Sequence, residues 1–331
     1  MTGLWADTRE IPQALERTLG AADGFSAVAE LLGRPGVRRV VAAGNGASYY
    51  VAQALWLASL SGRDGPEVVP VPAGLLAGAA FRWREGDVLL AFSSSGELRD
   101  LLEAVDGGAP SPFALVTASP ESSLAGLASA RALVAIEGQR AVTHTQAFCG
   151  GVAAALAIWA EVTRDESLRT AVASLPEVVE GLLAPAAHAA AGLTPDLVRV
   201  PAAVAFGSGP AWAGALEAAL LLKEVAGVPA EGVETREGAT SAMFGLSPGH
   251  LVLSLAADDD RLGREAEVTC RARGAFVLRV GGVDAADVRA AAITTFPGIV
   301  AVAERIGLDR GLDVDSPDWA ESYLRVARST A

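Results

Sequence analysis

The chain has 331 residues, of which 51% are hydrophobic, and a formal net charge of −13 at pH 7. This length accommodates about two domains of ordinary size, and so large an apolar fraction excludes a disordered chain. The acidic balance argues against non-specific binding of nucleic acid, although a helix N-terminus can still hold a phosphate group whatever the global charge.

Cysteine and histidine are too few and too dispersed for a disulfide framework or a metal cluster. The two cysteines are Cys149 and Cys270, and the sequence has three histidines. This usage indicates a reducing compartment and no metal site. The first ten residues lack the apolar core of a signal peptide, and the longest apolar run, 150–160, is shorter than the roughly 18 residues that span a bilayer. We therefore expect a cytoplasmic protein that binds neither membrane nor nucleic acid.

Strands alternate with helices through the first half of the chain. Apolar residues at helical spacing cover 11–32, with a break near 20–24. The pattern then predicts strands at 38–43, 67–71, 87–92, 112–117 and 132–136, helices at 49–58 and 97–105, and a short helix or loop at 73–81. This alternation is typical of a parallel sheet that is covered on both faces.

Helical segments separate this half from the next. The pattern at 145–162 is strongly helical, with small residues facing bulky ones. A second helical stretch, 168–193, is expected to be interrupted at Pro176 and Pro185, because proline lacks the backbone N–H that a helix interior needs. We interpret it as a packed connector between two halves.

The opening of the chain then repeats. Residues 204–215 align with residues 41–52 so that both glycines coincide and an aromatic residue follows each pair. Further strands are predicted at 202–206, 251–255 and 275–280, and a helix at 297–308. The strand 251–255 corresponds to 88–92, but an acidic turn, 257–260, follows it and would repel phosphate. The sequence thus predicts two similar α/β halves, of which only the first keeps a phosphate-type loop.

The serine-rich turn after strand 87–92 is the strongest functional signal. Ser93, Ser94, Ser95 and Gly96 stand between an apolar strand and a helical pattern that begins near Glu97. A strand, a small polar turn and a helix present backbone N–H groups and hydroxyl donors to an anion. The alternative is an ordinary connection in which a serine caps the helix.

The glycine loops do not match a nucleotide-binding fingerprint. Gly44, Asn45 and Gly46 lack the third glycine and the later acidic residue of a dinucleotide site, and no Walker-type lysine follows either loop. We therefore expect no cofactor, and interpret these glycines as sites of a sharp turn close to a ligand.

Four ordered segments together resemble the double sugar-isomerase (SIS) domain family. They are 46–49, 93–97, 145–148 and 215–224, and the resemblance spans about residues 10–330. The family includes phosphosugar isomerases, glucosamine-6-phosphate deaminases, fructosamine-phosphate deglycases and the isomerase half of glucosamine-fructose-6-phosphate aminotransferase. The resemblance implies an α/β protein with two flavodoxin-like SIS subdomains, each a parallel five-stranded sheet flanked by helices. It implies SIS domain 1 with an N-terminal helix at 1–165, a helical connector at 166–195, SIS domain 2 with a C-terminal tail at 196–331, and a homodimer with shared active sites.

The resemblance also implies the site residues. The phosphorylated substrate would be held by residues of the first two loops and of the later helix start, namely Gly46, Ala47, Ser48, Ser93, Ser94, Ser95 and Thr145. The family's proton-transferring glutamate falls on Glu224. Chemistry supports this position, because aldose–ketose interconversion needs one base that moves a proton between neighbouring carbons. The apolar stretch before Glu224 would raise its pKa, whereas the alternative is a solvated helix end beside Lys223.

Four positions depart from the family pattern. Leu98 replaces a threonine after the second loop, and Leu221 replaces a lysine. The family's ring-opening histidine falls on Thr240, which is a poor acid–base group, and its C-terminal lysine falls approximately on Arg325, which cannot form a Schiff base. Thr240 and Arg325 are therefore the expected catalytic positions beside Glu224, with altered chemistry.

The sequence accordingly predicts a protein that binds a phosphorylated sugar or amino sugar. An isomerase or deaminase-like enzyme is the first interpretation. The alternatives are an Amadori-type deglycase, which must protonate a leaving amine, and a non-catalytic sugar-phosphate sensor, which the replaced histidine and lysine favour.

Overall fold

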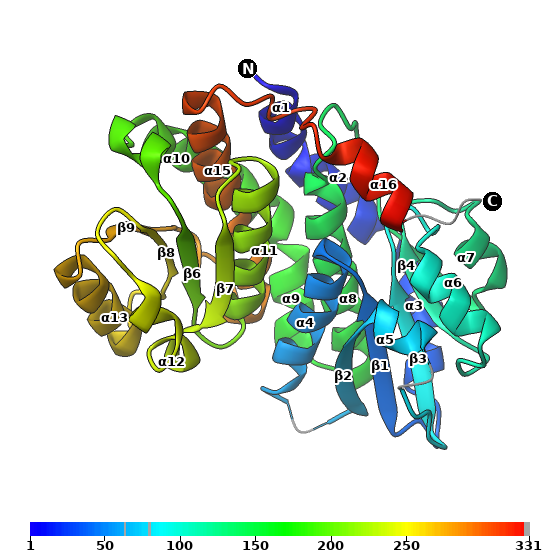
Figure 1. Ribbon diagram of the computed structural model, residues 1–331. Coiled ribbons are helices and arrows are strands. Elements are labelled where there is room, and N and C mark those ends of the chain that lie inside the picture. Colours follow the sequence, from blue (N-terminus) through cyan, green and yellow to red (C-terminus); the bar gives the residue numbers. More distant parts are fainter. Residues whose placement is uncertain (63, 79–80, 328–331) are drawn as a thin grey trace. The chain divides into compact units, whose positions relative to one another are not determined.

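The computed structural model describes residues 1–62, 64–78 and 81–327, which form two compact units, each built on one parallel sheet (Figure 1). The described residues of the first unit lie within 13–137, 146–173 and 318–327. The second unit comprises residues 1–12, 138–145 and 174–317. Each unit is built from several separate segments of the chain. The division into domains 1–165, 166–195 and 196–331 therefore remains a proposal.

The first sheet has five parallel strands in the order β2-β1-β3-β4-β5. They are β1 (Arg39–Gly44), β2 (Glu67–Pro72), β3 (Asp87–Phe92), β4 (Ala114–Thr117) and β5 (Ala130–Leu133). In β1 and β3, every residue after the first is buried, as expected for apolar strands that are covered on both faces. All five predicted strands are confirmed, with ends that differ by up to three residues.

Helices cover this sheet, and those expected at 49–58 and 97–105 begin within two residues of the expected positions. The helices wholly or mainly in the first unit are α2 (Ile11–Gly20), α3 (Ala22–Leu32), α4 (Ala47–Ser59), α5 (Ala73–Ala77), α6 (Arg99–Asp106), α7 (Ser123–Leu127), α8 (Thr145–Thr163), α9 (Glu166–Ala173) and α16 (Ala320–Ala327). Val41 and Leu89 of the sheet pack with Leu101 of α6 and Leu124 of α7 in one apolar cluster. The expected start of α6 near Glu97 was wrong by two residues, because Leu98 is extended and its side chain packs against that cluster.

The second sheet is smaller. Its described residues form four parallel strands in the order β7-β6-β8-β9. They are β6 (Ala203–Gly207), β7 (Ala230–Glu234), β8 (Leu251–Leu255) and β9 (Phe276–Arg279). The flavodoxin-like character of both halves is confirmed, but the expected fifth strand of this sheet is not found. After β9 the chain contains Gly281, Gly282 and Asp284 and passes through turns into a 3₁₀ segment, and such residues favour turns over a ladder.

The helices of the second unit include the first helix of the chain. They are α1 (Gly3–Arg9), α10 (Leu175–Ala191), α11 (Ala211–Glu224), α12 (Thr235–Gly238), α13 (Arg261–Ala272), α14 (Ala291–Thr294) and α15 (Phe296–Asp309), with 3₁₀ segments η1 (Pro195–Arg199), η2 (Ala242–Gly245) and η3 (Val288–Ala290). Helix α11 packs on β6 and β7, and α10 packs on α15.

The predicted interruption at Pro185 was wrong, because α10 continues through it. Pro185 is exposed, and so is Gly181. In a regular helix the Gly181 carbonyl would accept the N–H of residue 185, which proline lacks. That carbonyl can bond to water, while Val179 and Leu183 of the same helix are buried. Pro176 lies in the first turn of α10, where a missing N–H has no cost.

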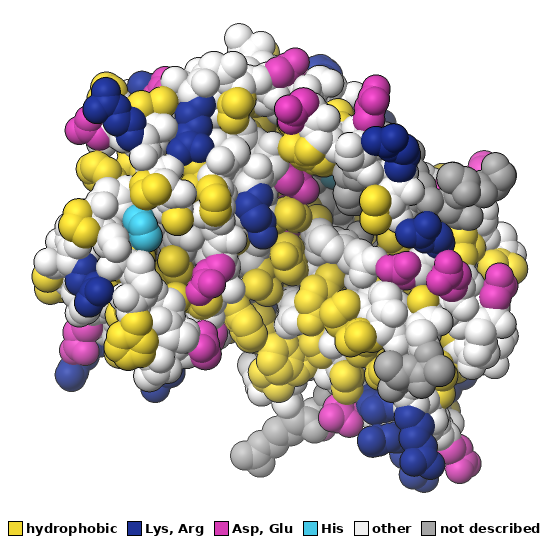
Figure 2. Space-filling view, in the orientation of Figure 1, with side chains coloured by type: hydrophobic (Ala, Val, Ile, Leu, Met, Phe, Trp, Pro, Cys, Tyr) yellow, Lys and Arg dark blue, Asp and Glu magenta, His cyan; other side chains and the backbone are white. Residues whose placement is uncertain are grey.

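Two helical segments of the described chain, 145–163 and 288–309, are long and apolar enough to cross a membrane. In each, 78% of the apolar window is buried inside the protein, so both are core helices of a soluble fold. On the surface drawn in Figure 2, acidic side chains lie among basic ones.

Candidate active site

The serine turn lies at the point where the strand order of the first sheet reverses. Strands β1 and β3 are neighbours, but the chain leaves β1 toward β2 on one side and leaves β3 toward β4 on the other (Figure 1). In open parallel sheets, ligands bind outside the carboxyl ends of the strands at such a switch point. The turn at 44–48 and the turn at 93–97 both start at these ends, so the structure brings the two predicted phosphate loops together.

The conformation of the serine turn depends on glycine. Gly96 has a φ of +65°, and a Cβ there would lie 1.9 Å from the Oγ of Ser122. Ser93 Oγ accepts the Gly96 N–H at 3.0 Å, and Ser95 Oγ accepts the Glu97 N–H at 3.3 Å. In these bonds each hydroxyl is the acceptor, so its own proton can still be donated to an anion.

The serines do not cap the helix that follows. The N-cap of α6 is Leu98, which makes no side-chain capping bond. The alternative interpretation, in which a serine of the turn caps α6, therefore lacks the hydrogen bond that such a cap would make. Helix α6 itself begins at Arg99, four residues after Ser95.

Helix α4 begins within the turn at 44–48. Gly46 is its N-cap with a φ of +54°, no side chain caps it, and Ala47 and Ser48 are its first two residues. Asn45 braces the turn: its Nδ2 donates to Asp100 Oδ2 at 2.8 Å, and its Oδ1 accepts the Ala73 N–H at 3.0 Å. The N-terminus of a 13-residue helix that has no side-chain cap and lies at a switch point attracts an anion through the helix dipole.

Glu224 ends α11 in the second unit and is the best acid–base candidate. Burial raises the pKa of Glu224 to about 7, against the opposing effects of a hydrogen bond from Thr143 and the charge of Lys223. Thr143 Oγ1 donates to Glu224 Oε2 at 3.5 Å. A pKa near neutrality suits a general base, which must lose and regain a proton at working pH. The expected raised pKa is confirmed, and a solvated helix end is not what the structure shows.

A second carboxyl on the same helix was missed by sequence reasoning. Glu217 lies seven residues before Glu224, is 1% exposed, and its Oε2 has no hydrogen-bond partner among the described residues. Burial, and after it the charge of the nearby Glu224, raises the pKa of Glu217 well above its ordinary value. The available signal was one glutamate within an otherwise alanine- and leucine-rich helical run.

The remaining predicted residues fall in different settings. Thr145 starts α8, is 2% exposed, and its Oγ1 has no partner among the described residues. Thr240 is exposed and its Oγ1 donates to the Glu237 carbonyl at 2.9 Å. Arg325 is exposed on α16 of the first unit and reaches Ser322 Oγ at 3.4 Å. Leu221 is fully buried, so the family's lysine position is a core position here.

No group of three or more His, Cys, Asp and Glu side chains that could hold a metal ion occurs in the described ranges.

Comparisons with known proteins agree with this architecture. The chain matches no protein-family model and no curated protein sequence. Among solved structures it is similar to the C-terminal domain of glucosamine-fructose-6-phosphate aminotransferase from Francisella tularensis (18% identity, 96% of this chain and 98% of that one, TM-score 0.82). It is also similar to glucosamine-6-phosphate deaminase from Thermotoga maritima (19%, 96% and 98%, 0.74) and to tagatose-6-phosphate ketose/aldose isomerase from Escherichia coli (19%, 95% and 94%, 0.74). The chain therefore has the double SIS fold that its sequence motifs resemble.

Proposed function

We propose that this protein binds a phosphorylated sugar or amino sugar and catalyses its isomerisation or deamination, with Glu224 as the base. The observation that carries the proposal is the half-buried carboxyl at the end of α11, whose pKa is raised to about 7. In this reaction the carboxylate removes a proton from one carbon of the open-chain sugar and returns it to the neighbouring carbon.

The phosphate is assigned to the two turns at the switch point of the first sheet. Ser48, Ser93, Ser94 and Ser95 supply hydroxyl donors, and the N-terminus of α4 at Gly46 and Ala47 supplies the positive end of the helix dipole. Thr145, with its unpartnered buried hydroxyl, is the further proposed contact. The solved structures with this fold include proteins named for phosphosugar chemistry, which supports the same ligand class.

Two replacements shape the substrate choice. Thr240 and Arg325 occupy the proposed positions of the family's ring opener and terminal lysine, but the Thr240 hydroxyl is bonded to a backbone carbonyl. A threonine is a poor acid–base group at neutral pH, so we propose a substrate that opens readily or is already acyclic. The rival functions are a deglycase acting on an Amadori-type phosphosugar and a sensor without turnover, which the buried Leu221 in place of a lysine favours.

We further propose a cytoplasmic homodimer. The small residues at 150–157 of α8 do not provide a face for this dimer. Gly150 and Gly151 pack inside the first unit, where a Cβ would lie 2.4 Å from Val134 and 3.2 Å from Val51 respectively. Light scattering at micromolar concentration tests the dimer, and a monomer alone would contradict it.

The function is tested by binding followed by isotope exchange. A thermal-shift screen of hexose, hexosamine and fructosamine phosphates identifies ligands, each compared with its unphosphorylated sugar. For each ligand, incubation in deuterated water followed by mass spectrometry reports incorporation at C1 or C2. We expect Glu224→Gln to reduce exchange by about 10²–10⁴-fold while leaving binding nearly intact, and Glu180→Gln, an exposed change on α10, to have no effect.

The outcomes separate the candidate functions. Binding of phosphosugars without exchange or product favours the sensor, and release of an amine from a fructosamine phosphate favours the deglycase. Normal exchange by Glu224→Gln places the base elsewhere, with Glu231 and Glu237 as the next residues to change. Thr240→His offers a separate check, because a gain of activity on a cyclic aminohexose phosphate supports the assigned position of the ring opener.

A further inference from the structure

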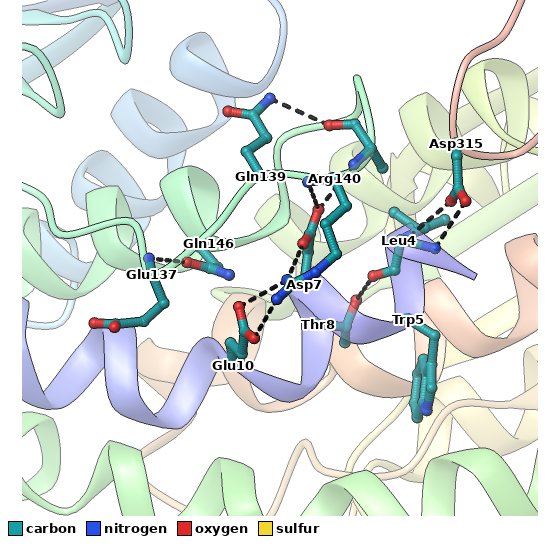
Figure 3. A network of polar contacts seen from close by, with 12 residues as sticks. Leu4, Trp5, Asp7, Thr8, Glu10, Glu137, Gln139, Arg140, Gln146 and Asp315 are labelled. Atoms are coloured by element: carbon teal, nitrogen blue, oxygen red, sulfur yellow. Dashed lines mark hydrogen bonds and ion pairs between the residues drawn. The ribbon is translucent and has the colours of Figure 1, made fainter. Parts of the chain in front are cut away.

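Asp7, near the N-terminus of the chain, binds a distant loop with its buried carboxylate. It lies on α1 and is 1% exposed. Its Oδ2 accepts the backbone N–H groups of Arg140 at 2.7 Å and Ala141 at 2.9 Å, and its Oδ1 accepts Arg140 Nη1 at 2.7 Å (Figure 3). A buried carboxylate that accepts several N–H donors is costly to disturb, because each donor would lose its partner in a low-dielectric site.

The neighbouring residues extend this anchorage. Arg140 also donates to both carboxylate oxygens of Glu10, at 2.8 and 2.7 Å. The Val142 N–H donates to the Asp315 carbonyl at 2.9 Å, and the Asp315 carboxylate accepts the N–H groups of Gly3 and Leu4 at the start of α1. Three consecutive backbone N–H groups, those of residues 140–142, are therefore held by α1 or by the segment that caps it.

The next residue along the loop contacts the proposed base. Thr143 is 4% exposed, and its Oγ1 donates to Glu224 Oε2 at 3.5 Å. This bond is long, and such contacts in ligand-free sites commonly tighten when substrate binds. Because rotation of a buried threonine side chain is restricted by its β-branch, the position of its hydroxyl follows the position of its backbone.

We propose that Asp7 is a positioning residue: by fixing the backbone at residues 140–142 it places the Thr143 hydroxyl against the Glu224 carboxyl. The significance of this contact for catalysis rests on the function proposed above, whereas the contact itself does not. The Thr143 hydroxyl stabilises the ionised carboxylate, so its displacement raises the pKa of Glu224.

Other charged groups lie on the helix that carries Glu224 and on the elements packed against it. On its own helix these are Lys223 and Glu217. On the elements packed against α11, the charged side chains are engaged elsewhere or exposed: Glu231 is exposed, Glu234 caps α12, Arg289 pairs with Asp287, Glu304 accepts from Thr2, and Arg305 pairs with Asp309. Strands β6 and β8 and helix α14 carry no charged residue. Thr143 is the loop residue whose hydroxyl donates to this carboxyl, and the titratable His144 follows it in the same loop.

The test titrates Glu224 directly by carbon NMR of the full chain labelled at the glutamate carboxyl carbon. Loss of one signal in Glu224→Gln assigns the resonance. We expect Thr143→Val to raise the pKa of Glu224 by about half a pH unit or more, and Asp7→Asn to raise it in the same direction. The variant that carries both Asp7→Asn and Thr143→Val should show no further rise in the pKa of Glu224, because both changes remove the same contact between Thr143 and Glu224. Glu10→Gln, which leaves the Asp7 bonds in place, is the matched control and should leave the titration unchanged.

A second variant covers the case in which Asp7→Asn does not fold. Arg140→Gln removes the ion pairs to both carboxylates at a half-exposed side chain, and should give a smaller rise in the same direction. An unchanged Glu224 titration in the folded Asp7 variant, or in Arg140→Gln if only that variant folds, overturns the proposal. Isotope exchange separates the positioning role of Asp7 from the proposed enzymatic function. A shifted Glu224 titration in the variants, with no exchange in the wild type, supports the positioning role and rejects the enzyme. Exchange in the wild type, with an unchanged titration in the variants, supports the enzyme and rejects the positioning role.

Discussion

Glu224 should make the stability of the folded protein depend on pH in a defined direction. Its pKa is raised from an ordinary 4.5 to about 7. Below pH 4.5 the carboxyl is protonated in both the folded and the unfolded chain. Between pH 4.5 and 7 the unfolded chain loses the proton while the folded chain keeps it, so the free energy of unfolding falls as the pH rises.

The magnitude follows from the size of the pKa change. A rise of about 2.5 pH units corresponds to about 3 kcal/mol of stability, lost between pH 4.5 and 7 and constant above it. The variant Glu224→Gln keeps an oxygen acceptor for Thr143 but has no titration. Relative to wild type, it should gain about 3 kcal/mol across this interval. Removing the Glu224 charge also lowers the pKa of Glu217, which adds to the difference in the same direction.

Urea unfolding, followed by circular dichroism at half-unit steps from pH 4.5 to 8, measures this difference. Glu180→Gln on α10 is the matched control, because it removes an exposed carboxyl from the same unit. If the stability difference between Glu224→Gln and wild type were the same at pH 4.5 and pH 7, the pKa of Glu224 would not be raised in the folded protein. The argument that Glu224 can act as a base near neutral pH would then fail.

Three further changes test the turns and the second carboxyl. Replacing Ser93 and Ser95 together with alanine should weaken binding of a sugar phosphate by about 1–3 kcal/mol, measured by calorimetry, because hydrogen bonds to a charged group are lost. Gly96→Ala should lower the melting temperature markedly, since its Cβ would lie 1.9 Å from Ser122 Oγ at a positive φ. Glu217→Gln should flatten the fall in stability with rising pH, because the raised pKa of Glu217 makes its ionisation costly above its unfolded value.

Each of these has a control and an opposing result. Ser61→Ala changes an exposed serine outside both turns, and equal affinity for the phosphorylated and plain sugar in wild type would argue against the phosphate site. Gly108 also has a positive φ, but a Cβ at this position would meet nothing within 4 Å. If Gly96→Ala and Gly108→Ala destabilised the protein equally, the clash with Ser122 would not be the cause of the effect at Gly96. A Glu217→Gln variant that keeps the wild-type pH dependence would mean that Glu217 is ionised in the fold.

The sequence alone determined the first sheet and the proposed phosphate turns. Val40–Ala43 and Val88–Phe92 are continuous apolar runs, and such runs are stable only as strands covered on both faces. The serine turn could be located for the same reason, because polar residues that follow a buried strand mark its carboxyl end. The second half was harder to predict. Strand β7, Ala230–Glu234, contains two glutamates and a glycine. It therefore lacks the apolar run by which its pairing with β6 could be predicted from sequence.

The tertiary structure decided which polar groups are buried together. Helix α10 passes through Pro185 because packing against α15 outweighs local propensity. Glu217 and Glu224 are seven residues apart on one helix, but only the fold removes Glu217 from water and so raises its pKa. Asp7 and Arg140 are 133 residues apart and no periodicity links them. Their pairing, and the contact of Thr143 with Glu224, arises because the chain returns residues 138–145 to the unit that contains α1 and α11, which a local sequence pattern cannot encode.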